Sequence, residues 1–175
     1  MKKLKNKDLQ RINIEEFRSA EKTPITIVLD NVRSALNVGS VFRTSDAFLI
    51  ENIILCGITA QPPNKDIRKA ALGATDSVKW EYIKNTTDAV KQLIKDGYHV
   101  VGIEQADKST QLNEFELPKK ALAIIMGNEV NGVSQEVIDI CNEVIEIPQF
   151  GTKHSLNVSV SAGILIWKIW EKMNT

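Results

Sequence analysis

Apolar runs alternate along this chain with segments of helical period, and this alternation indicates the fold class. Residues 25–32 form an unbroken β-branched run, which is typical of a central strand covered on both faces of a sheet. Further runs of strand character lie at 51–57, 78–84, 98–105, 121–126 and 143–147. The pattern predicts a single α/β domain with a mostly parallel six-stranded sheet.

Segments of helical period separate these strands, so helices are expected on both faces of the sheet. They lie at 34–50, near 65–69, at 87–97, at 133–141 and from residue 155 toward the C-terminus. Residues 7–19 also place apolar side chains among charges at a rough helical spacing. We therefore expect residues 1–20 to form an N-terminal helical arm and residues 21–175 to form the domain.

Composition and charge narrow the class of protein. Hydrophobic residues make up 43% of the chain and charged residues 25%, which is ordinary for a globular domain. Lys and Arg number 22, and Asp and Glu also number 22, so a polyanion would have to be bound by a local patch. The best candidate for a local patch is the short helix that carries Lys65, Arg68 and Lys69. The lysines of residues 7–19 could also contact RNA, although such a run is more often a solvated face.

Metal and membrane chemistry find little support in the sequence. The two cysteines and two histidines are far apart and have neither a disulfide framework nor a zinc-ligand spacing, so no metal is expected. The basic N-terminus is not followed by the apolar region of a signal peptide. The longest apolar run, residues 163–170, is too short to span a bilayer. A cytoplasmic location without membrane association is the expectation.

Three polar clusters, at 37–43, 127–132 and 151–157, each follow the end of a predicted strand. Ligands bind outside the carboxyl ends of the strands in open α/β sheets, so the clusters are expected to line one pocket. The glycine-rich fingerprints of dinucleotide and nucleoside triphosphate sites are absent from the sequence. Gly127 and Gly132 would bring backbone close to a ligand or simply shape a tight turn, and Glu129 would be a site carboxylate or a helix-start acid.

Ser155 and Asn157 open the long apolar segment near the C-terminus. The start of a helix exposes unpaired backbone N–H groups, which suit it to hold a ligand. The plain alternative is that Ser155 only caps this helix. The two clusters upstream favour the ligand-binding interpretation, and one hydroxyl can serve both purposes.

The clusters, read as NVGSVFRTSDAF, IIMGNEVNGVS and IPQFGTKHSLNVSVSAGI, resemble the three motifs of the TrmH (SpoU) family of RNA ribose 2′-O-methyltransferases in the SPOUT superfamily. The likeness runs from residue 25 onward, in matching order and spacing. It implies a C-terminal trefoil knot, which hydrophobic periodicity does not predict. It also implies a homodimer that transfers a methyl group from S-adenosylmethionine to a ribose 2′-hydroxyl of tRNA or rRNA.

The resemblance also implies the site residues. The catalytic positions are Asn37, Arg43, Glu129, Ser155 and Asn157, and the positions around the cofactor are Met126, Gly127, Asn128, Ile147, Pro148 and Leu156. RNA is expected to contact Arg33, Lys65, Arg68, Lys69 and Lys153. Arg43 is expected to orient a phosphate and stabilise developing alkoxide charge, because a guanidinium is effectively never deprotonated in proteins. The other polar side chains are expected to orient Arg43 and the ribose.

The chain departs from the family pattern at two places. Val130 and Asn131 stand where Gly or Glu is common, and Gln149 and Phe150 replace an apolar pair after the proline. Neither departure removes a proposed catalytic group. The N-terminal arm is short and no separate RNA-binding domain is expected, which leaves the RNA and the modified nucleotide open.

Two other classes of function compete with the methyltransferase. A non-catalytic RNA-binding or assembly factor on the same scaffold is suggested by the zero net charge and by the expectation that there is no separate RNA-binding domain. A nucleotide-dependent oxidoreductase is suggested only by the alternation of strands and helices, and it lacks any fingerprint. Retention of Arg43, Glu129, Ser155 and Asn157 favours the enzyme over both.

Overall fold

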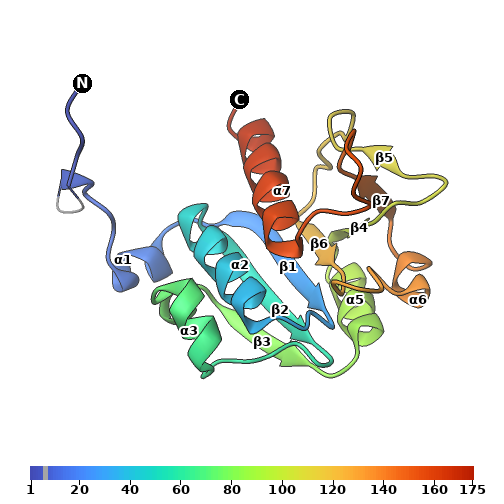
Figure 1. The fold of residues 1–175 in the computed structure, drawn as a ribbon, viewed down its shortest axis with the longest axis horizontal. Coiled ribbons are helices and arrows are strands. Elements are labelled where there is room, and N and C mark those ends of the chain that lie inside the picture. Colours follow the sequence, from blue (N-terminus) through green and yellow to red (C-terminus); the bar gives the residue numbers. More distant parts are fainter. Residues whose placement is uncertain (6–7) are drawn as a thin grey trace.

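A single parallel sheet forms the centre of the computed structural model, which describes residues 1–5 and 8–175 (Figure 1). Its strands are β1 (Thr23–Asp30), β2 (Ile50–Cys56), β3 (Trp80–Ile83), β4 (His99–Ile103), β5 (Thr110–Gln111), β6 (Leu122–Met126) and β7 (Glu143–Glu146). The order is β3-β2-β1-β6-β4-β7-β5, and every pair of neighbouring strands is parallel. The predicted α/β class with a parallel sheet is confirmed.

The sheet has seven strands in the described part of the chain, one more than the six predicted. The additional strand, β5, is Thr110–Gln111 and lies within a segment that is polar in sequence. It pairs with β7, Thr110 opposite Ile145 and Gln111 opposite Glu146. Two residues are too few to show a period, and their pairing depends on a strand more than thirty residues away in the chain.

Helices cover both faces of the sheet, as predicted. One face carries α1 (Ile14–Ser19), α2 (Ala35–Ala47), α3 (Lys65–Ala71), α4 (Ala74–Ser77) and α7 (Val158–Met173), and the other carries α5 (Thr86–Lys95) and α6 (Gln135–Ile138). Strand β1 serves both layers, since Ile27 and Leu29 join the first core while Val28 joins the second. This division follows from the alternation of side chains along a strand.

Two helices are shorter than their sequence patterns predict. The segment 133–141 forms only the single turn α6, and the C-terminal helix α7 begins at Val158 instead of residue 155. The reason for the first difference lies at Asn142, whose backbone N–H donates to the Val100 carbonyl at 2.8 Å while its side chain accepts from the Val100 N–H at 2.8 Å. This exchange draws the chain out of the helix and into β7.

Within the described residues of the N-terminal arm, the helix α1 occupies the second half. Asn13 and Glu16 form a capping box, with hydrogen bonds of 2.9 Å and 2.8 Å, that starts α1. Phe17 then inserts into the core on the α2 side of the sheet. The predicted helical segment begins at residue 7, which lies outside the described residues. No helix in the described part of the chain has both the length and the apolar character needed to cross a bilayer.

The order of the strands determines where a ligand can bind. From β1 the chain builds through β2 to β3 at one edge, crosses to β4 on the other side, and later inserts β6 between β1 and β4. The direction therefore reverses between β1 and β6. In open α/β sheets ligands bind at such a switch point, outside the carboxyl ends of the strands.

Candidate active site

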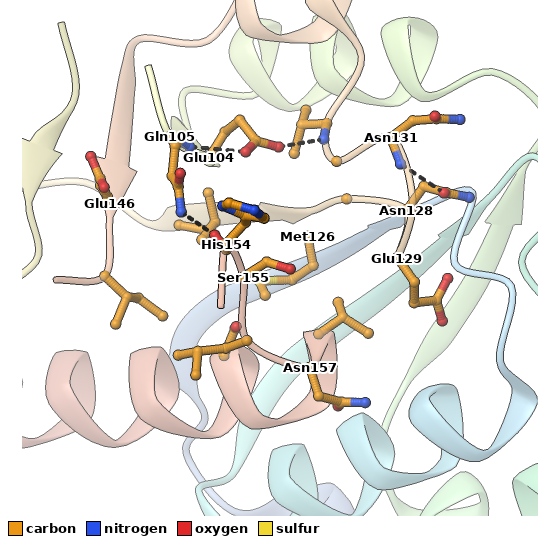
Figure 2. Close-up of a pocket in the computed structure, with 18 of the residues that line it drawn as sticks. Glu104, Gln105, Met126, Asn128, Glu129, Asn131, Glu146, His154, Ser155 and Asn157 are labelled. Atoms are coloured by element: carbon orange, nitrogen blue, oxygen red, sulfur yellow. Dashed lines mark hydrogen bonds between the residues drawn. The ribbon is translucent and has the colours of Figure 1, made fainter. Parts of the chain in front are cut away.

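A cavity of about 620 Å³ opens at the carboxyl edge of the sheet (Figure 2). The segments after β4 and β6, the end of β7 and the segment that leads into α7 form its walls. Eight residues predicted from the sequence line it: Met126, Gly127, Asn128, Glu129, Ile147, Ser155, Leu156 and Asn157. The second and third polar clusters therefore do meet at one pocket.

Glu129 binds the start of helix α2. Its carboxylate accepts hydrogen bonds from the Arg33 N–H at 2.8 Å and the Ser34 N–H at 3.0 Å, and from the Asn37 amide at 3.0 Å. Partial burial raises the pKa of Glu129, but these hydrogen bonds lower it by more, so the pKa lies below its usual value. Glu129 is therefore an anion at neutral pH. Both proposed roles, site carboxylate and helix-start acid, are combined in this one side chain.

Asn157 and Asn37 continue this network to helix α7. The Asn157 side-chain oxygen accepts from the N–H groups of Ser159 at 2.9 Å and Val160 at 3.4 Å, and its amide donates to the Asn37 oxygen at 3.1 Å. Because Asn37 in turn donates to Glu129, a continuous chain of side-chain hydrogen bonds joins all three polar clusters. The starts of α2 and α7 are thus held to the segment after β6.

The interpretation of Ser155 as the helix cap is wrong. The cap of α7 is Asn157, whose oxygen satisfies two of the free N–H groups at the helix start. Ser155 lies two residues earlier, is exposed and lines the cavity. Within the described residues its hydroxyl has no hydrogen-bond partner, which leaves it free to contact a ligand. Figure 2 shows Ser155 between Met126 and His154.

A tight turn forms the segment after β6. Asn128 and Gly132 pair through two backbone hydrogen bonds of 3.0 Å and 2.9 Å, and the Asn128 side chain accepts from the Val130 and Asn131 N–H groups. Gly132 has a φ of 66°, and a Cβ there would lie 1.9 Å from a Glu104 carboxylate oxygen. The glycine is therefore required by the turn and by the approach of Glu104.

Arg43 stands apart from the other predicted catalytic residues. It lies on helix α2 with its side chain exposed and does not line the cavity. Within the described part of the chain, no hydrogen bond or ion pair joins Arg43 to Asn37, Glu129 or Asn157. The amide of Asn157 faces Asn37 instead.

The predicted RNA-contacting residues lie at two places. Lys65, Arg68 and Lys69 are exposed on the short helix α3, as expected, and this helix packs closely against α2, where a Cβ on Gly39 would lie 2.5 Å from the Ile67 carbonyl oxygen. Lys153 is exposed in the segment before α7. Arg33 is exposed beside Glu129. Pro148 is not among the residues that line the cavity.

Glu104, Gln105, Glu146 and His154 also line the cavity, and sequence reasoning missed them. Glu104 accepts from the Val133 N–H at 3.0 Å, and the Gln105 amide donates to the His154 carbonyl at 2.6 Å (Figure 2). Glu104 and Gln105 directly follow β4. The signal that could have found them is the one that identified the three polar clusters, namely polar residues that follow the end of a predicted strand. The lining carries three carboxylates and, among the described residues, no Lys or Arg.

Neither the thiols nor the possible metal ligands of the described residues form a reactive-thiol site or a metal site. Burial raises the pKa of Cys56 to about 12 and that of Cys141 to about 11, so both thiols are protonated at neutral pH. Among residues 1–5 and 8–175, no group of three or more His, Cys, Asp or Glu side chains is placed to hold a metal ion.

The parallel α/β fold and the three joined polar clusters define a class of protein. Comparison with known proteins identifies the family. Residues 24–167 match the SpoU rRNA Methylase family, and the chain belongs to this family. The resemblance of the three motifs is thereby confirmed.

Individual relatives support the assignment to this family. The 23S rRNA (guanosine-2′-O-)-methyltransferase RlmB of Neisseria meningitidis is 30% identical over 156 residues, which are 89% of this chain and 62% of that protein. The AdoMet-bound rRNA methyltransferase of Sinorhizobium meliloti superposes with a TM-score of 0.81 at 27% identity, over 90% of this chain and 60% of that one. The chain spans 62% to 64% of the length of the first curated relatives that it matches.

A TrmH/SpoU tRNA modifying enzyme of A. aeolicus has the same fold. It superposes with a TM-score of 0.82 at 24% identity, over 92% of this chain and 81% of that one. The identity is low, so this likeness establishes the fold alone.

Proposed function

We propose that this protein transfers a methyl group from S-adenosylmethionine to a ribose 2′-hydroxyl of tRNA or rRNA. The observation that carries the proposal is the chain of hydrogen bonds from Glu129 through Asn37 to Asn157, which joins the three family motifs and of which Glu129 and Asn157 line the cavity. The relative named as a guanosine-2′-O-methyltransferase and the AdoMet-bound structural relative support the same reaction and cofactor.

The cavity fits S-adenosylmethionine in size and chemistry. A volume of about 620 Å³ is within the usual range for a small-molecule site. Met126, Ile147 and Leu156 offer apolar surface to the adenine, while Glu104, Glu129 and Glu146 lower the electrostatic potential for a cation. The bound cofactor supplies an activated methyl group on a sulfonium.

The protein's own residues then have distinct tasks. Hydrogen bonds join the polar groups of Glu129, Asn37 and Asn157 to one another and to the starts of α2 and α7. We therefore propose that these three residues position the site. Ser155 is free to contact the ribose at the cavity. Arg43 orients a phosphate and stabilises charge on the ribose oxygen, since its guanidinium does not accept a proton.

A homodimer completes the proposal. Val160, Ile164 and Trp167 follow one another at helical spacing on α7 and are 37% to 51% exposed, although each is apolar. Leu36, at 47% exposed, adds to this surface from α2, which packs against α7. Arg43 lies seven residues beyond Leu36 on α2, hence on the same helical face, so the dimer contact surrounds it.

The trefoil knot and the cytoplasmic location remain parts of the proposal. The Gln105–His154 hydrogen bond holds the segment before α7 against the end of β4, which supports a chain that passes through a closed loop there. RNA contacts are assigned to Lys153, which is exposed in the segment before α7, and to the exposed cations of α3. The two thiols carry no disulfide, in keeping with a reducing compartment.

The proposal is tested with the purified chain, S-adenosylmethionine and RNA. Calorimetry measures cofactor binding, and a tritiated cofactor measures methyl transfer to unfractionated tRNA and rRNA, followed by nucleoside analysis for 2′-O-methyl ribose. We expect binding and transfer, with Arg43→Ala reducing transfer at least 100-fold while cofactor affinity is kept. Lys91→Ala, an exposed cation on α5, serves as the matched control.

RNA binding without any methyl transfer would support the non-catalytic RNA-binding factor instead. Absence of cofactor binding together with an Arg43→Ala variant as active as the parent would contradict the proposed reaction altogether.

A further inference from the structure

Phe150 is an aromatic side chain that the fold does not use. It is 97% exposed, whereas the other exposed large apolar side chains beyond Met1 range from 37% to 69%. The exposed ring contributes nothing to the core. Phe150 also belongs to one of the two places where the sequence departs from the family motifs. The other departure, Val130, is the next most exposed at 69% and lines the cavity.

The position of Phe150 relates it to the proposed active site. Gln149 on one side of it and His154 and Ser155 on the other line the cavity, so Phe150 lies on the rim. The Gln105 hydrogen bond to the His154 carbonyl holds this part of the chain to the end of β4 (Figure 2). Residues 150–157 are all exposed, which leaves the rim open to a large partner.

Charge beside Phe150 favours a polyanionic partner. Lys153 is three residues away, is exposed and forms no ion pair within the described residues. Proteins that bind single-stranded nucleic acid combine cations for the phosphates with aromatic rings on which bases stack. A base held in a duplex is stacked on both faces and offers no free face to such a ring.

We propose that Phe150 stacks on an unpaired base of the RNA substrate, at the rim of the cavity that takes the reacting ribose. The substrate class is accordingly a single-stranded segment or loop, with Lys153 on an adjacent phosphate. This inference rests on the proposed function for the identity of the partner, and its test uses binding, so that either can fail without the other.

The experiment compares Phe150→Ala, Phe150→Trp and the control Ile94→Ala, which removes an exposed apolar side chain on α5 that does not line the cavity. The probes are a fluorescein-labelled 12-nucleotide RNA of mixed sequence and the same strand in a duplex, measured by anisotropy with cofactor present. Stacking on one base is worth about 5-fold to 100-fold in affinity. We expect Phe150→Ala to lose that factor on the single strand, Phe150→Trp to retain affinity, and the duplex to change less than about 2-fold.

Cofactor affinity and oligomeric state are measured on the same variants. Equal affinity of the parent and Phe150→Ala for the single strand overturns the inference, as does an equal loss on the duplex. A Phe150→Ala variant that dissociates into monomers, or that loses cofactor affinity, also overturns it, since Phe150 would then contact a second copy or the cofactor. If the parent binds RNA through Phe150 and transfers no methyl group, the proposed reaction fails and the stacking contact stands.

Discussion

At the scale of single residues, hydrogen bonds explain why polar groups far apart in sequence act together. Glu129 accepts from two backbone N–H groups at the start of α2 and from Asn37. A carboxylate in that place accepts hydrogen bonds from N–H groups that would otherwise be unpaired, and it interacts favourably with the helix dipole. It is poorly suited to accept a proton from the ribose, because its pKa lies below the usual value.

Replacing Glu129 by Gln removes the charge and keeps the shape. We expect a loss of about 1 kcal/mol in the free energy of unfolding, the usual worth of a helix-start cap. Methyl transfer should fall at least 10-fold, because the Gln amide offers one acceptor oxygen where the carboxylate offers two, so at least one of the three donors from Arg33, Ser34 and Asn37 loses its acceptor. Urea unfolding and single-turnover kinetics measure the two effects. Glu136→Gln, an exposed acid on α6, is the control, and equal effects of the two substitutions would contradict the assigned role.

The stability difference between the parent and Glu129→Gln should depend on pH. The folded state holds the pKa of Glu129 below its unfolded value, so the carboxylate contributes its full stabilisation at any pH above that unfolded value. Its contribution is lost as the pH falls through the lower, folded value. Urea midpoints of both proteins from pH 7 to pH 3 test this. A difference that grows on acidification would have the wrong sign.

At the scale of elements, two close approaches fix the segment after β6. A Cβ at Gly127 would lie 2.2 Å from the Gly132 carbonyl carbon, and one at Gly132 would meet Glu104. These contacts close the turn between Asn128 and Gly132 and bring it against the end of β4. A neighbouring pair of strands therefore holds the wall of the cavity.

Gly132→Ala should disturb this wall. The positive φ is unfavourable for Ala, and the new Cβ would displace Glu104 from its hydrogen bond to the Val133 N–H. We expect a loss of about 1–2 kcal/mol in unfolding free energy and weaker cofactor binding. Gly151→Ala, where a Cβ would have no neighbour within 4 Å, should change either quantity very little. Thermal unfolding and calorimetry of the two variants decide between these outcomes.

In our proposal, the exposed apolar face of α7 contacts a second copy of the chain. Val160→Asp places a charge in that apolar face at a first-turn position, where an acid favours the helix itself. We expect the folded protein to become a monomer in analytical ultracentrifugation and to lose methyl transfer. Ile94→Lys, a charge on the exposed face of α5, should leave the oligomeric state unchanged. A Val160→Asp dimer with full activity would rule this face out as the interface.

At the scale of the whole molecule, zero net charge makes the location of the cations decisive. The chain has as many acidic as basic residues, so long-range attraction of RNA is weak and a local surface must supply it. The exposed cations of α3 are the strongest such surface in the sequence, and the structure attaches their helix firmly to α2.

Two triple substitutions of equal charge change separate the local surface from net charge. The first replaces Lys65, Arg68 and Lys69 by Ala, and the second replaces Lys84, Lys91 and Lys95 by Ala. We expect only the first to weaken RNA binding, and to reduce the slope of log affinity against log salt by about 2, near 0.7–0.9 for each lost phosphate contact. Fluorescence anisotropy over a salt series provides the slope. Equal slopes for the two variants would show that α3 does not contact RNA.

The amino-acid pattern was sufficient for the layers of this fold, because burial on both faces leaves a continuous apolar run for each long strand and helical spacing for each covering helix. The three polar clusters could be found in the same way, since strand ends are visible in sequence. The two-residue β5 and the early end of α6 could not, because they depend on pairing with β7 and on the Asn142 contact with Val100.

The site divides in the same manner. Glu129, which closely follows a strand, and Asn157, which precedes the last helix, were accessible from the sequence, and so was their family. The tertiary structure alone decided which helix each caps, that Asn37 lies between them, and that Glu104 closes the turn beneath the cavity. The physical reason is that a hydrogen bond depends on a distance of about 3 Å, which is set by the packing of the sheet and the helices and not by separation along the chain.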